Sequence, residues 1–376
     1  MLNLSVIKSA MDRRGLTGTS LAQACQVSKE AVSNWLSGDS IPRPGKLPKL
    51  AETLQLTVEQ LFVSDETPEP IVAYRTKTNR PATGAALDAA QEVALHLREL
   101  AQYVEPRLKY EPRQLKDPQL EIDYVRGVAA ETRASLGLAP DQVLTNEHLV
   151  QLFKSFGAYL VPVFWGLNKE RHENALNVYI PESKESWVVF NLGCKKDDYK
   201  YWLAHEYAHC LSLHKLQDEP GEKFAERFAQ FLLFPDEVAQ VCLDEMQSAK
   251  KPMDVANSYA ERLDISIVTV LKGVDRLLVE QKKPESGLVN QAFWGRWKAG
   301  RELVPSFAHE LFGTDTPAVD EFIAKCEQVY DTPVFKALAN LQRQEGGRNP
   351  AFIAAALKVG LGEAVGLSHA LWQAQV

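Results

Sequence analysis

The sequence lacks the features that mark secreted and membrane proteins. Its opening segment, MLNLSVIKSAMDRRG, contains no apolar stretch followed by a cleavage site of small residues, so we expect no signal peptide. No run approaches the roughly 18 uninterrupted apolar residues that a membrane helix needs. We therefore expect a cytoplasmic protein that has no membrane partner.

Cysteine is scarce, and its spacing excludes two common roles. The five cysteines are Cys25, Cys194, Cys210, Cys242 and Cys326, an odd number in which no pair has CxxC spacing. This pattern argues against a disulfide framework and against a zinc site built from thiolates. We expect small, buried side chains in a reducing compartment.

A strong excess of one charge is also missing. The net charge of −7 is not typical of a nucleic-acid-binding protein, but a sum over the whole chain can hide a local patch. Residues 1–64 carry seven basic and five acidic side chains, a net charge of +2, so the acidic excess lies in the remainder.

The length of 376 residues predicts two or three domains. Short capped helices are predicted over residues 1–64, followed by a linker rich in proline, threonine and charge over 65–84. A helical connector is predicted over 85–140, an α+β core over 141–282, and a helical C-terminal region of unknown role over 283–376.

Three short strands are predicted in the core. The segments 158–165, 175–180 and 186–191 are rich in β-branched and aromatic residues and are separated by polar stretches. A helix containing HEYAH follows, and then a second helix, EKFAERFAQFLLF. Residues 256–278 have the pattern of a helical hairpin with Ser266 as a cap, which we interpret as structural packing.

The motif HEYAH, residues 205–209, is the strongest indication of chemistry. Residues four apart share a face of a helix, so the imidazoles of His205 and His209 can reach one ion. Glu206 would stand beside that ion, where it can take a proton from water. The alternative interpretation is a pair of surface histidines on an amphipathic helix.

A catalytic zinc ion usually has three protein ligands and one open position, so a third ligand is needed. Glu222 lies thirteen residues past His209 and extends by one turn an apolar stripe at helical spacing. The stripe consists of Ala225, Phe228, Ala229 and Leu232. Because this stripe is expected to pack on the HEYAH helix, the carboxylate of Glu222 is predicted to face that helix.

HEYAH followed by EKFAERFAQFLLFP resembles the ImmA/IrrE-type metallopeptidases, a family of the gluzincin type. Their pattern is HExxH, then a helix with E-x-x-A-(N/D)-x-F-A and a terminal L-L-x-P, and the resemblance spans about residues 140–280. It implies a zinc metalloendopeptidase with a zincin-like α+β core and a small mixed sheet. Zn²⁺ would be held by His205, His209 and Glu222, and Glu206 would be the catalytic carboxylate.

Other polar side chains near the motif have less defined roles. Glu226 stands where the family favours Asn or Asp; it would orient a ligand histidine or compete with Glu222 as ligand. His214 is expected to be structural or to lie at the edge of the cleft, and His172 and Tyr207 are candidate donors to the transition state.

The resemblance also implies a mechanism and a substrate class. Zinc would activate a water molecule and the scissile carbonyl, and Glu206 would pass a proton to the leaving amine. Gluzincins bind substrate as an added strand along a sheet edge, and the strand at 186–191 is the predicted edge. Family members commonly cut a helix-turn-helix repressor, in stress responses, mobile-element control or toxin–antitoxin-like pairs.

Residues 20–38 have the spacing of a helix-turn-helix. Ser20 and Ser28 are predicted to cap its two helices, and Gly38 to end the second. With its W-x-x-G and its later L-x-x-L-A-x-x-L, the stretch up to Phe62 resembles an XRE/Cro-type domain.

This second resemblance implies double-stranded DNA as a partner. Lys29, Glu30, Ser33 and Asn34 would face the major groove, and Arg43 and Lys46 would lie near phosphates. Because one such domain neutralises few phosphates, a homodimer is expected. The alternative is a small helical module that contacts protein, since a net charge of +2 is small for DNA binding.

Two rival functions remain for the whole chain. In the first, the protein is a DNA-binding transcriptional regulator whose peptidase-like domain has become a sensor of a ligand or partner. In the second, it is an antitoxin-like binding protein with the C-terminal region as its partner surface.

Overall fold

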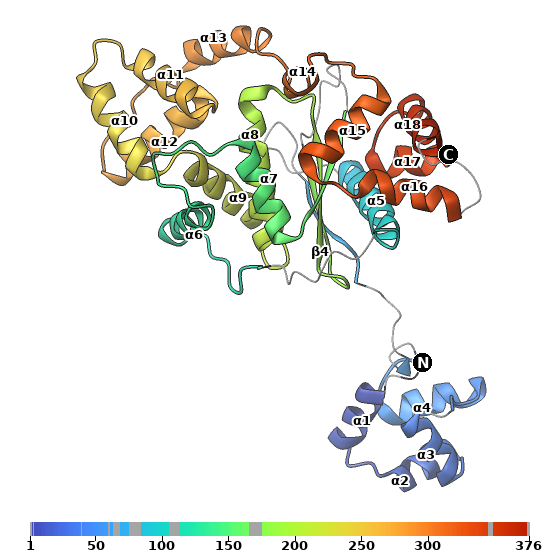
Figure 1. Ribbon diagram of the computed structural model, residues 1–376. Helices are drawn as coiled ribbons and strands as arrows, with labels where there is room; N and C mark the ends of the chain where they lie inside the picture. Colours follow the sequence, from blue (N-terminus) through green and yellow to red (C-terminus); the bar gives the residue numbers. More distant parts are fainter. Residues whose placement is uncertain are drawn as a thin grey trace. The chain divides into compact units, whose positions relative to one another are not determined.

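A computed structural model gives the structure of the chain. It describes residues 2, 4–38, 40–58, 61–62, 68–74, 84–104, 113–164, 175–344 and 349–373. The chain forms two compact units, Met1–Glu69 and Pro70–Val376, each with its own hydrophobic core. Helices dominate both units, and the larger one also contains a small mixed sheet (Figure 1).

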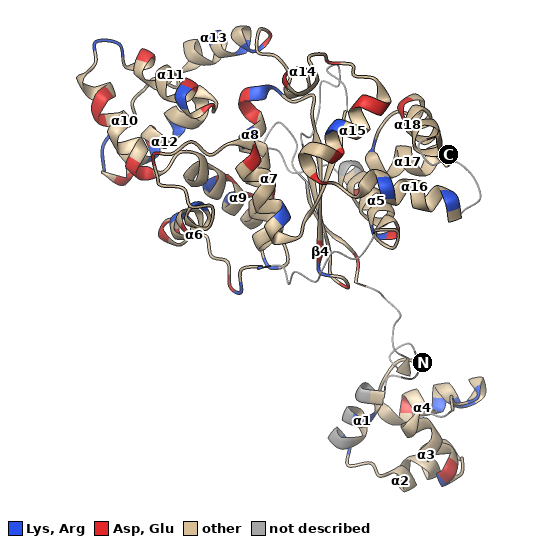
Figure 2. Cartoon of the chain, viewed as in Figure 1, with Lys and Arg blue, Asp and Glu red and all other residues tan. Residues whose placement is uncertain are grey.

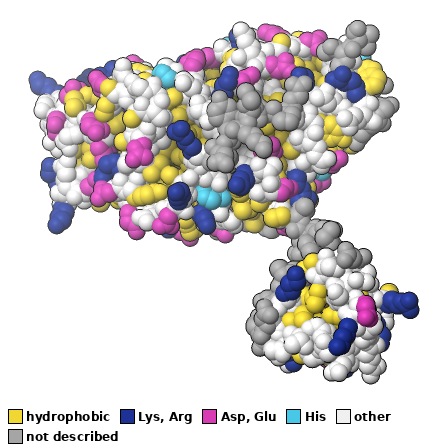
Figure 3. Space-filling view, turned by 60° about the horizontal axis from the view of Figure 1, so that its bottom comes forward, with side chains coloured by type: hydrophobic (Ala, Val, Ile, Leu, Met, Phe, Trp, Pro, Cys, Tyr) yellow, Lys and Arg dark blue, Asp and Glu magenta, His cyan; other side chains and the backbone are white. Residues whose placement is uncertain are grey.

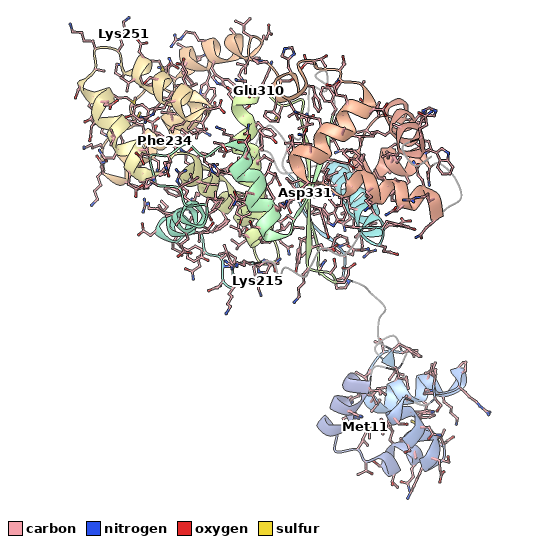
Figure 4. All side chains as sticks on the ribbon, in the orientation of Figure 1. Met11, Lys215, Phe234, Lys251, Glu310 and Asp331 are labelled. Atoms are coloured by element: carbon pink, nitrogen blue, oxygen red, sulfur yellow. The ribbon has the colours of Figure 1, made fainter. Side chains whose placement is uncertain are left out.

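The smaller unit is a cluster of short helices. They are α1 (Leu4–Arg13), α2 (Gly18–Cys25), α3 (Lys29–Ser37), a 3-10 turn (Pro44–Lys46) and α4 (Leu47–Leu54). Every helix contributes buried apolar side chains to one core, including Ile7, Leu21, Val32 and Leu50. Met11, labelled in Figure 4, is buried and belongs to the same core.

Capping side chains fix the boundaries of α2 and α3. Ser28 caps α3 by accepting a hydrogen bond from the backbone N–H of Ala31, and Gly38 ends that helix with a φ of 86°, as predicted. The prediction for Ser20 is wrong, because α2 begins two residues earlier. Thr17 is the cap, and Ser20 completes a reciprocal capping box with it.

The larger unit is built on a four-stranded mixed sheet in the order β1-β3-β4-β2. The strands are β1 (Ile71–Tyr74), β2 (Tyr159–Val163), β3 (Ala175–Ile180) and β4 (Glu185–Asn191). β3 pairs antiparallel with both β1 and β4, whereas β2 pairs parallel with β4. All residues of β2 and β3 are buried, so both faces of the sheet are covered.

Two sequence-based predictions about the sheet are wrong. Residues 71–74, assigned to the linker, form β1, because pairing with β3 supplies an order that four residues lack by themselves. β4 is not an edge, because β2 crosses over to pair with its outer side. Within the described residues, the edges of the sheet are β1 and β2.

Helices cover the sheet on two sides (Figure 1). On one side lie α7 (Asn146–Phe156), α8 (Lys196–Ser212) and α9 (Asp218–Leu233). On the other side lie α5 (Gly84–Ala101) and α16 (Val334–Gln344). α8 therefore packs both on the sheet, through β3, and on its neighbour α9.

The remaining helices extend these layers. They are α6 (Ile122–Ser135), α10 (Asp236–Ser248), α11 (Pro252–Leu263), α12 (Ile267–Glu280), α13 (Gln291–Arg301), α14 (Phe307–Phe312), α15 (Val319–Tyr330), α17 (Pro350–Leu357) and α18 (Leu361–Gln373). The hairpin of α11 and α12 has the predicted cap at Ser266. Lys200 of α8 donates to the carbonyl of Leu263, which ties the hairpin to the core.

The C-terminal region is part of the same core as the sheet. The backbone N–H groups of Phe307 and Ala308 donate to the carbonyls of Cys194 and Leu192, at 2.8 Å each. The hydroxyls of Tyr199 and Tyr330 lie 2.9 Å apart, and both rings are buried. The segment 283–376 therefore supplies a wall of the larger unit.

No single helix among the described residues is long and apolar enough to cross a membrane. The pair α17 and α18 passes that test of length and composition only when taken together, with a bend of 116° between them. All five cysteines are unpaired and buried, as expected.

The contact between α12 and the end of α9 depends on a glycine. A Cβ added at Gly273 would lie 2.5 Å from Cδ1 of Phe234 and 2.8 Å from Nε2 of Gln230. Phe234, labelled in Figure 4, is fully buried. The absence of a side chain at 273 thus allows the two helices to meet.

We expect Gly273→Ala to lower the free energy of unfolding of the larger unit by about 1–3 kcal/mol, because the helix or the ring must move. Thermal denaturation followed by circular dichroism measures the change. Gly127→Ala on α6 is the matched control, since nothing lies within 4 Å of its added Cβ and alanine favours a helix by about 1 kcal/mol. Equal melting temperatures for the two variants would contradict the tight contact.

Candidate functional site

The helix α8 carries HEYAH and is anchored at its start. Asp197 and Asp198 lie in its first turn, where carboxylates favour a helix N-terminus, and both form ion pairs with Arg301. The two imidazoles of the motif are almost completely buried, with 1% of His205 and 2% of His209 exposed. The interpretation of these histidines as surface residues is therefore wrong.

Asn177 of β3 fixes α8 against the sheet. Its fully buried side-chain amide donates to the backbone carbonyl of Glu206 at 2.9 Å and lies 3.5 Å from Sγ of Cys210. This contact sets the position of α8 along β3. Sequence reasoning missed Asn177, whose only signal was a polar residue inside the apolar strand ALNVYI.

Gly221 allows the turn after α8 to close tightly against the start of α9. Lys215 lies in this turn (Figure 4). A Cβ at Gly221 would lie 2.7 Å from the carbonyl oxygen of Leu216 and 3.9 Å from Cε1 of His209. The backbone before Glu222 therefore runs directly beside the second histidine. Sequence reasoning missed this residue too, although a glycine at the beginning of a helix was a visible signal.

The structure brings His205, His209 and Glu222 together. The two Nε2 atoms lie 3.1 Å apart. Nε2 of His205 lies 3.3 Å from one carboxylate oxygen of Glu222, and Nε2 of His209 lies 3.2 Å from the other. Ligand atoms bound at about 2.0–2.1 Å in a tetrahedron lie about 3.3–3.4 Å from one another. The three groups thus have the spacing of ligands around one small cation.

The cluster is buried on the histidine side and accessible on the carboxylate side, where the side chain of Glu222 is 23% exposed. Burial acts to raise the pKa of Glu222, but the hydrogen bonds and charges of the two histidines outweigh burial and hold that pKa well below its usual range. The carboxylate is therefore ionised at neutral pH, as a metal ligand must be.

Three other residues that the sequence singles out lie in different surroundings. Glu206 is buried beside the cluster, at 4% exposed. Glu226, also on α9, is half-buried and is not a member of the cluster. His172 lies outside the described residues.

The position of Tyr207 does not favour its candidate role as a donor to the transition state. Its ring is buried in the core, edge-on to Phe153 and Phe156, and burial raises the pKa of its hydroxyl. His214 lies after the helix, with its ring near Tyr179, and burial lowers its pKa. It does not belong to the cluster of ligand atoms.

In the smaller unit, α3 presents its predicted DNA-contacting residues to solvent. Lys29, Glu30, Ser33 and Asn34 are all exposed along one face, whereas Val32 and Trp35 on the opposite face are buried. Acidic side chains are few on the face of this unit seen in Figure 3. The larger unit shows acidic and basic side chains interspersed (Figure 2).

The structure defines the surroundings of three residues that are predicted to contact DNA. The ammonium group of Lys46 donates to the backbone carbonyls of Cys25 and Gln26, at 3.3 and 3.2 Å. It thereby pairs with carbonyl groups that the end of α2 leaves without helical partners. Hydrogen bonds from its own backbone and from Ser28 lower the pKa of Glu30, which lies in the first turn of α3. Arg43 is exposed, as a phosphate contact requires.

Comparison with known families identifies the smaller unit. A helix-turn-helix family matches residues 7–61, which include α2, α3 and the turn between them. No curated protein matches the chain. The family match makes the N-terminal unit a helix-turn-helix domain of the DNA-binding, regulatory kind, with double-stranded DNA as its partner.

The exposed face of α3 predicts two different effects on DNA binding. With a duplex selected from a random pool, we expect Asn34→Ala to reduce the free energy of DNA binding by about 1–3 kcal/mol and to relax the sequence preference. We expect Arg43→Ala to weaken binding to any duplex and to lower the slope of log affinity against log salt concentration by about 1. Fluorescence anisotropy at several salt concentrations measures both. Lys49→Ala is the control, because Lys49 pairs with Glu52 on α4; a loss as large as that of Asn34→Ala would rule out α3 as the reading helix.

Proposed function

We propose that the larger unit is a zinc-dependent metalloendopeptidase joined to the helix-turn-helix domain. In this proposal His205, His209 and Glu222 hold Zn²⁺, and Glu206 is the catalytic carboxylate. The protein would act in the cytoplasm, without a membrane partner, and would control transcription by cleaving another protein.

One observation carries the proposal: the separation of 3.1–3.3 Å between two Nε2 atoms and a carboxylate. Two imidazoles and one carboxylate form a common ligand set for catalytic zinc, which keeps a fourth position open. The partial exposure of Glu222 is consistent with such an open position. The residues present therefore fit a zinc ion in number, chemical type and spacing.

The chemistry divides between the metal and the chain. A bound zinc ion supplies Lewis-acid activation of water and of the scissile carbonyl. The carboxylate of Glu206 accepts a proton from the attacking water and delivers it to the leaving amine. Asn177 holds the backbone of Glu206 through its carbonyl, so it positions the residue that moves the proton.

The substrate class rests on the resemblance to the ImmA/IrrE-type peptidases. It is a repressor-type regulator of the helix-turn-helix kind, and DNA binding by the smaller unit would bring the peptidase close to such a protein. A homodimer is proposed for the DNA-bound form. If substrate adds a strand to the sheet, the described edges β1 and β2 are available, and β4 is not.

Zinc content tests the ligand set. After dialysis against buffered zinc, we expect about one zinc ion per chain in the native protein, and a loss of affinity of at least about tenfold in His205→Ala and in Glu222→Gln, since each removes one of three ligands. Plasma mass spectrometry of the dialysed protein measures it.

Glu219→Gln is the matched control on the same helix and is expected to keep its zinc, because Glu219 is exposed and pairs with Lys223. The assignment of the third ligand would be overturned if Glu226→Gln lost the metal while Glu222→Gln retained it.

Proteolysis tests the reaction itself. The zinc-loaded protein is incubated with a protein extract, and newly formed amino termini are labelled and identified by mass spectrometry. We expect zinc-dependent new termini that fall by about 10²–10⁴-fold with Glu206→Gln, which retains the ligands but cannot accept the proton. A variant that binds zinc normally and cleaves as well as the native protein would exclude Glu206 as the base. Normal zinc binding with no cleavage by either protein would favour the alternative, a DNA-binding regulator with a sensing domain.

A further inference from the structure

The larger unit contains an apolar cavity at the end of β2. The cavity has a volume of about 480 Å³. It is partly open and is lined by the last residues of β2, by the loop before α15, and by α15, α17 and α18, which lie together in Figure 1. Its apolar wall includes Val163, Phe164, Val319, Phe322, Leu357 and Leu367. These residues belong to none of the elements that carry the metal cluster.

Two glycines of α18 leave one wall of the cavity without side chains. Gly362 and Gly366 both line it and are four residues apart, so they lie on one face of the helix. Nothing lies within 4 Å of a Cβ built at Gly362, and a Cβ at Gly366 would meet only Cγ2 of Val319, at 3.5 Å. Close packing therefore does not require glycine at these positions, and the missing side chains leave space along this wall.

The only ionisable groups on the described lining are two carboxylates. Asp315 accepts a hydrogen bond from the hydroxyl of Ser306, and Glu363 accepts one from the backbone N–H of Gly360 at 2.9 Å. No lysine, arginine or histidine is among the lining residues that the structure describes. Against this described part of the lining, an anionic guest would meet like charge, and its desolvation would be costly.

We propose that this cavity binds a small, uncharged, predominantly apolar molecule. Its volume falls within the range of about 300–1,000 Å³ typical of small-molecule sites, which are mostly apolar with a few polar groups. The proposal does not depend on the metal cluster or on peptidase activity.

The cavity is connected to the start of α8. Ser306, which bonds Asp315 at the cavity, pairs in a β-bridge with Lys195. The next residue, Phe307, stacks on Tyr199 of α8 with the ring centroids 3.4 Å apart. A residue that lines the cavity, Asp315, is thus hydrogen-bonded to the segment that packs against the helix carrying HEYAH.

The test uses two probes with one ring system. N-phenyl-1-naphthylamine is neutral and becomes fluorescent in apolar sites, and its 8-sulfonate, 1-anilinonaphthalene-8-sulfonate, is the anionic analogue. With the full chain, we expect saturable binding of the neutral probe and at least roughly tenfold weaker binding of the sulfonate. Glu363→Gln retains an acceptor oxygen for the backbone N–H of Gly360 but removes a negative charge. It should therefore reduce the difference in affinity between the neutral probe and the sulfonate.

Filling the cavity should remove the site. Gly366→Leu and Gly362→Leu are each expected to weaken binding of the neutral probe by about tenfold or more, because the new side chain occupies the space. Measuring the melting temperature of both variants establishes that they fold, and Gly362→Leu is the safer one because of its open surroundings.

The control lies on the same helix. Val365 is 51% exposed on the outer side of α18, so Val365→Ser should leave binding unchanged. The proposal is overturned if Val365→Ser abolishes binding while the two leucine variants bind normally, which would mean that the probe lies on the surface. Absence of saturable binding to the native chain, or equal affinity for the two probes, would also overturn it.

Discussion

The close packing of α8 on α9 is the constraint on which the proposed chemistry depends. Two histidines on one helix can approach an ion from one side only, and the third group must come from a different element. Alanines at 204, 208, 225 and 229 are fully buried on the two helices, and such small side chains let helix axes approach closely. Gly221 adds a tight turn, so the carboxylate of Glu222 reaches the imidazoles without a long or flexible connection.

The rest of the larger unit supports that arrangement from behind. The sheet is buried on both faces, and Asn177 connects it to the middle of α8 by one hydrogen bond to the backbone. The C-terminal region closes the opposite side and holds the segment that leads into α8. A chain shortened at residue 283 would therefore lose part of the core of the larger unit.

Sequence reasoning succeeded where the signal was local. The four-residue spacing of the histidines, the apolar stripe that continues to Glu222, and the caps at Ser28 and Ser266 all follow from helix geometry. It failed where order comes from distant partners. β1 is four residues long and exists only by pairing with β3, about a hundred residues later in the chain. The parallel pairing of β2 with β4, and the burial of Tyr207, likewise depend on contacts that no local pattern encodes.

The measurement that bears most directly on this account is an anomalous difference map from crystals of the zinc-loaded protein, recorded on both sides of the zinc absorption edge. The account predicts one strong peak about 2.0–2.2 Å from Nε2 of His205, Nε2 of His209 and an oxygen of Glu222. A fully zinc-saturated crystal with no peak among these three side chains, or with a peak held by Glu226 instead of Glu222, would contradict it.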